Sequence, residues 1–382
     1  MHDGAGRATL KDHPITNDPV GSHDTAPEMP THREWSRKVA PYAAPDPQRS
    51  LLQLLYTVVP MAGIWFAMAL LVDDAYWATL LLSVPAAALL VRLFMIQHDC
   101  GHHSFFRTAW LNEWVGRAIG ILTLTPHGYW RRAHNIHHAT SGDLDRRGIG
   151  DVTMLTVREY LALPRWKRLA YRLYRNPITI LIIGPIYLFV IKFRLPLDIL
   201  RRNPRQRREV LLSAMLTNAM IAALFIGLGL WLGFADIVML QAPIVLLSSA
   251  AGVWLFYIQH QFEHAYWRGH TEWNFQDAAI EGSSFYDLPQ PLRWITADIG
   301  IHHVHHLSSK IPNYRLHECM ANLPELPGVT RLTLRDSAAC LRLALYDEAT
   351  GRMVRFAALR DRPTAAGKDP HADGCFDANK CR

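Results

Sequence analysis

The main signal for the fold of this 382-residue chain lies in residues 75–103, AYWATLLLSVPAAALLVRLFMIQHDCGHH. Residues 75–97 form an apolar run that is long enough to cross a lipid bilayer, which takes about 20 residues. The run leads directly into three histidines, His98, His102 and His103. Because imidazole is a common ligand of transition metals, the sequence predicts a metal site where this span leaves the membrane.

Three further segments are apolar and long enough to span a bilayer, namely 51–72, 210–232 and 237–258. Short turns at residues 73–74 and 233–236 join the four spans into two pairs, and neither turn contains Lys or Arg. Basic residues are concentrated instead in 158–175 and 201–208. Since positive charge marks the cytoplasmic side, we expect an all-α integral membrane protein with two helical hairpins and a cytoplasmic helical cap.

A fifth apolar stretch, 178–197, is ambiguous. Gly184 and Pro185 interrupt it, and Lys192 and Arg194 lie within it. A fifth crossing would also place the histidines before and after it on opposite sides of the membrane. We therefore expect this stretch to be re-entrant or to lie in the membrane interface.

The ends of the chain are polar, in contrast to its middle. We expect residues 1–50 to form a disordered arm, 51–345 to form the membrane domain and 346–382 to form a polar tail. The five cysteines include no CxxC pair, which argues against a disulfide scaffold. The net charge is +7, but the arginines flank membrane segments and form no groove-reading motif, so we expect no binding of nucleic acid.

Most of the 20 histidines fall into four clusters: HDCGHH (98–103), HNIHH (134–138), HQFEH (260–264) and HHVHH (302–306). Spacings of three and four residues place imidazoles on one face of a helix, where two rings can bind one ion or two adjacent ions. Nine or more convergent histidines exceed the four ligands of a structural zinc site and suggest two metal ions. The carboxylates that are candidates to orient the rings are Asp99, Asp145, Glu263 and Asp298.

With their surroundings, these clusters resemble the membrane fatty acid desaturases, specifically the bacterial acyl-lipid branch. The resemblance extends from about residue 50 to residue 345 and includes HDCGHHSFF, HNIHHATSGDLDRRGIGD, QHQFEHAYW and HHVHHLSSKIPNYRL. It implies a four-span bundle in the inner (cytoplasmic) membrane of a bacterium, with a non-haem di-iron centre on the cytoplasmic side. Members resembling Δ12/ω6 and Δ5 desaturases both remain alternatives.

The resemblance also implies a set of iron ligands. Transferred by position, the ligands are His98, His102, His134, His137, His138, His302, His305 and His306. A further ligand is expected between the second and third boxes, and either His260 or His264 supplies it. His103 and His303 adjoin the motif positions and are candidates to orient the ligands, and Asp298 stands where the family pattern leads us to expect asparagine.

The implied reaction is O₂-dependent introduction of a cis double bond into the acyl chain of a membrane lipid. Electrons would come from a separate ferredoxin or cytochrome b5-like carrier, and an apolar tunnel would hold the chain. The candidates for its wall are Trp65, Phe66, Trp254 and Phe256. The alternatives are a hydroxylase, ketolase or acetylenase on the same scaffold, or a membrane metal transporter, which the lack of His, Asp and Glu in the outer two-thirds of the spans disfavours.

Overall fold

The computed structural model describes residues 32–197, 206–323 and 328–360. Four of its helices are long and apolar enough to cross a membrane: α2 (Pro47–Leu71), α3 (Tyr76–Gly101), α10 (Arg207–Leu232) and α11 (Phe234–His260). These helices occupy the four segments predicted to span a bilayer, and each is longer than the apolar run from which it was predicted. The sequence pattern therefore located the long helices correctly but underestimated their length.

Local interactions explain where two of the long helices begin. The carboxylate of Asp46 accepts hydrogen bonds from the backbone N–H groups of Gln48 and Arg49, which caps the first turn of α2. Gly233 alone separates α10 from α11, with a φ of 105° that favours glycine. A Cβ atom at this position would meet the carboxylate of Asp236. The turn expected at residues 233–236 is therefore reduced to this one glycine, because α11 already begins at Phe234.

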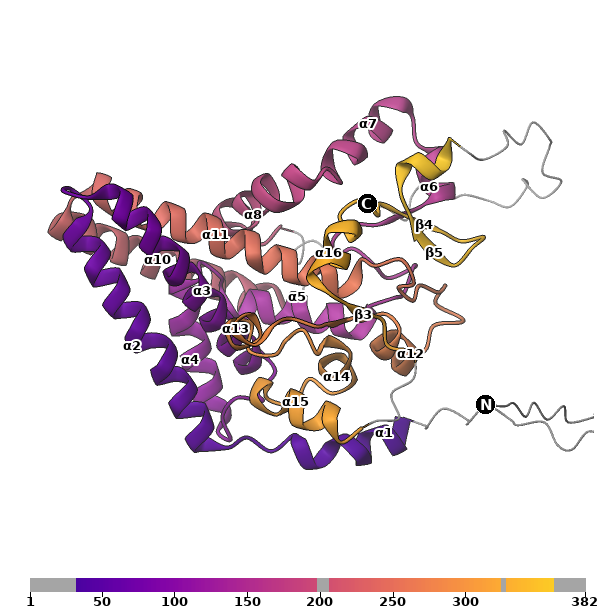
Figure 1. The fold of residues 1–382 in the computed structure, drawn as a ribbon, viewed down its shortest axis with the longest axis horizontal. Helices are drawn as coiled ribbons and strands as arrows, with labels where there is room; N and C mark the ends of the chain where they lie inside the picture. The colour runs from indigo at the N-terminus through magenta and orange to yellow at the C-terminus, as the bar shows by residue number, and fades with distance from the viewer. Residues whose placement is uncertain (1–31, 198–205, 324–327, 361–382) are drawn as a thin grey trace, which may run out of the picture.

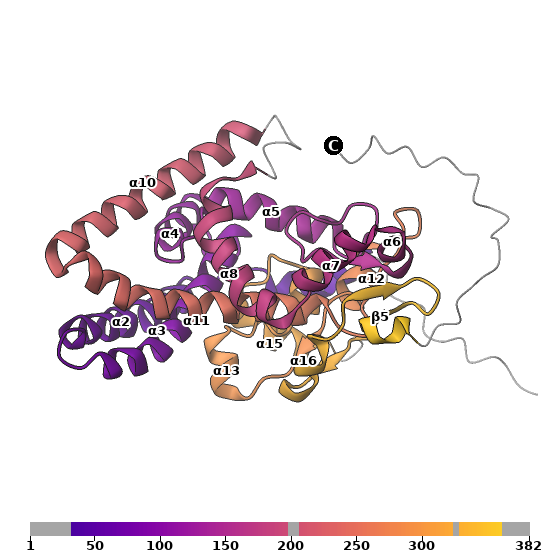
Figure 2. The same ribbon diagram turned by 90° about the horizontal axis from the view of Figure 1, so that it is seen from above.

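Helix α3 lies at the centre of the long helices. It packs against α2, α11 and α4 (Ala109–Leu122), and the core between them includes Met68, Leu93 and Leu240. The other three long helices leave much of their apolar surface exposed, as membrane-facing helices do. The long helices extend to one side of the molecule, and the short elements gather on the other side (Figures 1 and 2).

We call these short elements the head. Its helices are α1 (His32–Val39), α5 (His127–Thr140), α6 (Val157–Ala162), α12 (Phe275–Ile280), α13 (Gln290–Ile295), α14 (His302–Leu307), α15 (Asn313–Ala321) and α16 (Leu334–Cys340). Short 3₁₀ turns follow at Ala40–Tyr42 and Phe356–Leu359. Most of the buried polar residues, including the histidines, lie in the head or where the long helices enter it.

The head also contains short strands, which the all-α expectation missed. Strand β1 (Leu155–Thr156) pairs in parallel with β4 (Leu345–Asp347), which pairs antiparallel with β5 (Arg352–Val354). In a second sheet, β2 (Phe285–Tyr286) pairs in parallel with β3 (Arg331–Leu332). Strands of two or three residues are too short to produce an alternating pattern of apolar and polar residues in the sequence. Their formation depends on tertiary contacts.

The apolar stretch 178–197 is not a straight helix. Helix α7 (Arg165–Tyr174) is followed, at an angle of 62°, by a helical segment that spans Thr179–Arg194. This segment consists of π-helical turns η2 (Thr179–Ile183) and η3 (Tyr187–Ile191), the short α8 (Gly184–Ile186) and the 3₁₀ turn η4 (Lys192–Arg194). By length and composition alone, α7 and this segment would also pass as one broken span.

The structure differs from the expected boundaries at both ends of the membrane domain. Trp35 of α1 is buried, and it packs in a cluster that includes Leu316 and Cys319 of α15. Strands β4 and β5 likewise fold residues that were expected in the C-terminal tail. Buried side chains in otherwise polar segments explain both differences, while residues 1–31 and 361–382 lie outside the described part of the chain.

Candidate metal centre

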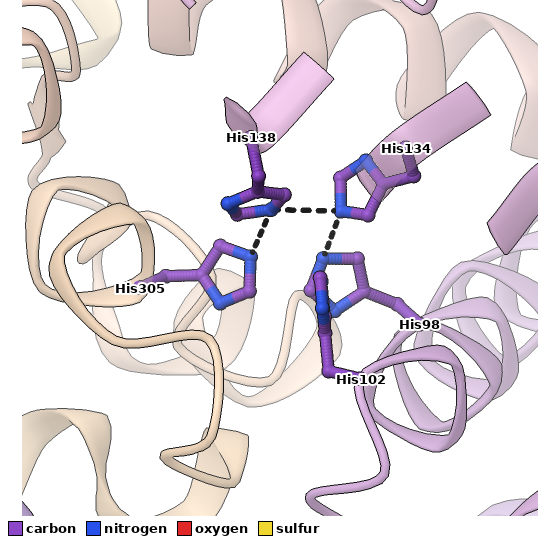
Figure 3. Close-up of side chains that lie close together, drawn as sticks. All are labelled: His98, His102, His134, His138 and His305. Atoms are coloured by element: carbon purple, nitrogen blue, oxygen red, sulfur yellow. Dashed lines mark hydrogen bonds between the residues drawn. The ribbon is translucent and has the colours of Figure 1, made fainter. Parts of the chain in front are cut away.

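Nine histidines from the four sequence clusters meet in the head. The first group contains His98, His102, His134, His138 and His305. The second group contains His137, His260, His302 and His306. In each group the ring nitrogens that can bind a metal lie within 4.8 Å of one another, and Figure 3 shows the rings of the first group pointing toward a common centre.

Helical spacing explains how neighbouring histidines are divided between the groups. Residues four apart lie about 40° apart around an α-helix, so His134 and His138 of α5 face the first group together. His137 lies on the adjacent side of α5 and faces the second group. Helix α14 shows the same division, because His302 and His306 enter the second group and His305 enters the first.

The Nε2 atoms within each group are close together. In the first group, His134 Nε2 lies 3.0 Å from His98 Nε2 and 3.1 Å from His138 Nε2 (Figure 3). In the second group, His260 Nε2 lies 3.1 Å from His137 Nε2 and 2.9 Å from His302 Nε2. Two nitrogens at right angles, each about 2.1 Å from one ion, would be about 3.0 Å apart. These distances therefore fit shared coordination of a metal.

Hydrogen bonds on the outer side of the rings determine which nitrogen faces inward. His137 Nδ1 lies 2.5 Å from the carboxylate of Asp151, and His260 Nδ1 lies 3.1 Å from the carbonyl oxygen of Gly282. Both partners only accept, so in uncharged rings Nδ1 carries the proton and Nε2 has a lone pair. The two lone pairs then face each other at 3.1 Å, which is not a hydrogen bond but is the arrangement that a cation between them would stabilise.

The electrostatics of the site favour uncharged rings. Burial, followed by the neighbouring imidazoles, holds the pKa of His134, His138 and His302 well below the ordinary value of 6.5. The Nε2 atoms of His102 and His306 are buried and have no hydrogen-bond partner. A buried polar atom without a partner costs about 1–3 kcal/mol. Uncharged rings with inward lone pairs are the donor set that a transition metal requires, so the residues present fit a metal centre.

Among the carboxylates proposed from sequence, Asp99 has the contacts of a ring-orienting residue. Its Oδ1 lies 3.1 Å from His98 Nδ1, and its Oδ2 accepts hydrogen bonds from the backbone N–H and the side-chain amide of Asn313. Asn313 in turn accepts a hydrogen bond from Gln53 of α2. This chain of contacts ties the first group to α15 and α2.

The other three proposed carboxylates do not reach the histidine groups. Glu263 is exposed and lies 3.6 Å from Arg352. Asp145 accepts the backbone N–H of His270, and Asp298 accepts a hydrogen bond from Arg293 at 2.7 Å. Each therefore has a local partner on the surface of the head.

The structure also shows which of the remaining candidate histidines lie outside the two groups. His264 is exposed and outside both groups, because α11 ends at His260 and the next residue, Gln261, leaves the helical conformation. His103 has a φ of 54° and contacts Glu113 at 3.1 Å. His303 is buried on another side of α14, with its ring centre 6.1 Å from that of Phe285.

Sequence reasoning missed two side chains that contact the rings. Asp151 reaches His137 because the turn before it places Gly150 at a φ of 76°, close to the carbonyl oxygen of Ala133. Trp130 stacks on His134 with 4.6 Å between the ring centres. The Gly-Ile-Gly-Asp sequence at 148–151 was the available signal for Asp151, and the four-residue spacing on α5 was the signal for Trp130.

An apolar cavity of about 230 Å³ adjoins the two groups. It reaches His98 and His134 of the first group and His302 of the second, and Phe256 forms part of its wall. Of the four tunnel residues expected from sequence, Phe256 alone lines this cavity. Trp65 instead donates a hydrogen bond to Gln241, Trp254 donates one to Tyr286, and Phe66 is exposed.

Comparison with known proteins identifies the family. The family model described as "Fatty acid desaturase" matches residues 75–337, which include all nine grouped histidines. The chain belongs to the fatty acid desaturase family. This confirms the resemblance inferred from the histidine boxes.

Individual members of the fatty acid desaturase family cover most of the chain. The chain is 44% identical to the "Fatty acid desaturase" of Bacillus subtilis over 337 residues, which is 88% of this chain and 94% of the relative. It is 27% identical to the "sn-1 acyl-lipid omega-3 desaturase (ferredoxin)" of Synechocystis over 79% of this chain and 82% of that protein. It is also 27% identical to the "sn-1 oleoyl-lipid 12-desaturase" of Synechocystis, over 61% of this chain and 64% of that protein.

Proposed function

We propose that this member of the family is an acyl-lipid desaturase, which uses O₂ to introduce a cis double bond into an acyl chain of a membrane lipid. One observation carries the proposal: nine histidine rings meet in two groups beside an apolar cavity. The names of the Synechocystis relatives support a lipid-bound acyl chain as the substrate. A site of this shape is suited to an apolar chain brought alongside a pair of metal ions.

We propose that each histidine group holds one iron ion of a non-haem di-iron centre. The first set of ligands is His98, His102, His134, His138 and His305, and the second is His137, His260, His302 and His306. Bound iron would supply the ability to activate O₂ and remove hydrogen from an unactivated C–H bond. Of the two candidates for the further ligand, we assign His260, because His260 lies in the second histidine group and His264 lies in neither group.

The protein's own residues would position both the ligands and the substrate. Asp99, Asp151 and the carbonyl group of Gly282 hold Nδ1–H of three rings, so that the Nε2 lone pairs stay directed inward. The apolar wall, which includes Phe94 and Phe256, would exclude water and hold the acyl chain beside the rings. Selectivity among C–H bonds then follows from how far the chain extends into the cavity.

We propose the following membrane arrangement. Helices α2 and α3 form one hairpin and α10 and α11 the other, with the head on the cytoplasmic side of a bacterial inner membrane. The short turns between the paired helices contain no Lys or Arg, which supports this orientation. Residues 51–345 are the core of the membrane desaturase domain.

The segment α7–η4 would lie in the cytoplasmic membrane interface. On α7, Trp166, Leu169 and Leu173 are exposed on one face of the helix, while basic residues occupy other faces. An apolar stripe beside basic side chains is typical of a helix that lies on the surface of a bilayer. The bend of 62° after α7 supports an interfacial or re-entrant path over a straight crossing.

Electrons would come from a separate ferredoxin or cytochrome b5-like carrier. Ferredoxin is part of the name of the Synechocystis omega-3 relative. The exposed basic residues of the head match the acidic surface that such a carrier would present. Each double bond requires two electrons in addition to the two taken from the acyl chain, because one O₂ is reduced to two molecules of water.

The proposal is tested by expression in a host that lacks polyunsaturated lipids, followed by mass spectrometry of its acyl chains. We expect new chains that have lost one H₂ and carry a cis double bond, and we expect none with the His137→Ala variant. Chains that have gained one oxygen atom would instead indicate a hydroxylase. An unchanged lipid profile, with iron-loaded protein and a working electron donor, would contradict the proposed function.

A further inference from the structure

A single charged residue lies within the apolar runs of the four long helices. Across residues 51–72, 75–97, 210–232 and 237–258, Arg92 of α3 is the only Asp, Glu, Lys or Arg. A charge at such a position is energetically costly in a membrane protein and usually marks a site that uses it. Arg92 is also buried, with 8% of its surface exposed, so it does not extend to water as long basic side chains near the end of a span often do.

Helix α13 of the head covers Arg92. The guanidinium group donates a hydrogen bond from Nη1 to the carbonyl oxygen of Trp294, and its Cζ lies 4.2 Å from the centre of the Trp294 ring. The Nε atom of Arg92 is buried and has no hydrogen-bond partner. A carbonyl group and an aromatic ring stabilise the cation in part, but neither supplies a negative charge.

Arg92 borders a cavity of about 490 Å³ between α2, α3, α13 and the start of α15, which we call the Arg92 cavity. Its volume lies within the range of about 300–1,000 Å³ that is usual for ligand sites. Among the described residues, none lines both this cavity and the one beside the histidines. Successive residues point about 100° apart around an α-helix, so Val91 faces the histidine cavity while Arg92 faces the second one. The two cavities are therefore separate sites.

The charges in the wall of the Arg92 cavity do not balance. Arg92 and Arg293 are its basic residues, and Asp298 is the one acidic residue among the described residues that line it. Asp298 accepts a hydrogen bond from Arg293 at 2.7 Å. No described carboxylate forms an ion pair with Arg92. One carboxylate beside two guanidinium groups leaves one positive charge, which an anion in the cavity would balance.

A second side chain in the wall also lacks a partner, and its neighbours determine how it is oriented. The carboxylate of Asp99 accepts a hydrogen bond from the side-chain amide of Asn313 at 2.8 Å, which turns Asn313 Oδ1 toward Gln53. Gln53 therefore donates from Nε2 to Asn313 Oδ1 at 3.0 Å, and its Oε1 is left buried without a donor. A ligand with a hydroxyl group beside its anion would supply the missing donor.

We propose that the Arg92 cavity binds an oxyanion that carries a neighbouring hydroxyl group, such as a phosphoglycerol group, at a site distinct from the substrate cavity. The N–H groups of guanidinium match the oxygens of phosphates and carboxylates. Asn313 lines this cavity and also supports Asp99, so an occupant would reinforce the contacts behind the first histidine group. A phosphoglycerol group occurs both in soluble glycerol phosphate and in lipid headgroups, and the test distinguishes these sources.

The test measures binding of sn-glycerol 3-phosphate to the full-length, iron-loaded protein in a non-ionic detergent by calorimetry. We expect Arg92→Gln to raise the Kd by at least about tenfold, because a hydrogen bond to a charged group is lost. Asp298→Asn should lower the Kd by about threefold, because it removes the competing carboxylate. Asparagine tolerates the φ of 55° at this position. The matched controls are Arg331→Gln and Asp287→Asn, which remove the same charges from an ion pair outside the cavity.

A purely structural role for Arg92 predicts a different result. If Arg92 served only to hold α13, Arg92→Gln would lower the Tm of the ligand-free protein and leave the Kd unchanged, which would overturn the inference. We expect instead that this Tm does not fall, because the substitution removes a buried charge that has no carboxylate partner. Should Arg92→Gln fail to fold, an unchanged Kd in Asp298→Asn would overturn the inference.

Two further ligands identify the source of the anion. Dihexanoyl phosphatidylglycerol carries the same phosphoglycerol group on a lipid, and glycerol lacks the phosphate. Tighter Arg92-dependent binding of the lipid would support a headgroup as the occupant, and tighter binding of sn-glycerol 3-phosphate would support a soluble one. Binding of glycerol as tight as that of sn-glycerol 3-phosphate would overturn the inference, as would equal binding of both phosphates by wild type and Arg92→Gln. None of these measurements requires turnover, so the inference stands or falls separately from the proposed function.

Discussion

The two histidine groups are assembled in different ways. The first group contains two pairs that are four residues apart on a helix, His98 with His102 and His134 with His138. The second group contains one such pair, His302 with His306, and two single residues from separate helices, His137 and His260. Helical geometry builds most of the first group locally, whereas the second depends on the packing of α5, α11 and α14.

The residues that orient the rings show the same contrast. Asp99 follows His98 directly on α3, so one helix supplies both the ring and its carboxylate. In the second group, Asp151 is 14 residues from His137, and Gly282 is 22 residues from His260. The second group therefore depends more on loops. A comparison of substitutions in the two groups tests how this dependence affects iron content, activity and Tm.

The largest effect is expected from the loss of a single ligand in the smaller group. His137→Ala leaves three histidines in the second group and also removes the contact of Asp151 with an imidazole. We expect activity to fall below detection and the iron content to fall by about half, as measured by elemental analysis.

His102→Ala provides the comparison in the first group, since it leaves four histidines, and we expect it to retain more iron than His137→Ala. His264→Ala is the matched control, because this exposed residue lies outside both groups. Equal loss of iron in the two ligand variants would show that the number of ligands does not distinguish the groups. Loss of activity in His264→Ala would contradict the placement of the second group.

Removal of a single charge next to each group should have the next largest effect. Asp151→Asn and Asp99→Asn should each weaken iron binding or activity by about 10- to 100-fold, because an uncharged amide polarises the imidazole less. Asp99 also accepts two hydrogen bonds from Asn313, so Asp99→Asn should additionally lower the Tm of the iron-free protein. If Asp151→Asn lowered that Tm more than Asp99→Asn, the assignment of this second, structural role to Asp99 would fail.

A substitution in the cavity should reduce activity without affecting either group. Gly252→Leu would place a side chain in open space along α11. We expect kcat/KM for long acyl chains to fall by about tenfold, with a smaller effect on short chains and unchanged iron content. Gly227→Leu is a suitable control, because Gly227 is exposed on α10 and also has no atom near its Cβ position. Loss of iron in Gly252→Leu would show that the cavity and the metal centre are not separable.

The smallest effect concerns pH. Burial is the main cause of the lowered pKa of His102 in the first group and of His306 in the second. The unfolded chain binds protons below about pH 6.5 that the folded rings do not bind, so stability is full above this pH and decreases below it. Each such ring costs at most about 1.4 kcal/mol per pH unit.

We therefore expect the Tm of the iron-free protein to fall between pH 7 and pH 5, and bound iron to reduce this fall. His102→Gln and His306→Gln should each make the pH dependence less steep, and the ratio of the two changes compares the groups directly. A Tm that rose on acidification would contradict the uncharged state of these rings.

The sequence by itself determined the family, the four long helices and most of the histidines that meet in the two groups. An apolar run of about 20 residues is a local property, and spacings of three and four residues place histidines on a helix face wherever that helix lies. A separation of 14 positions, as between His137 and Asp151, carries no such information, because the turn through Gly150 decides whether the chain returns to α5.

Only the tertiary structure decided the remaining features. It placed His260 in the second group and His264 on the surface, because α11 ends between them. It divided the histidines of α5 and α14 between two groups, and it brought Lys192 to the wall of the cavity that reaches His98. These outcomes depend on where helices end and how they pack, which is set by contacts between residues far apart in the chain.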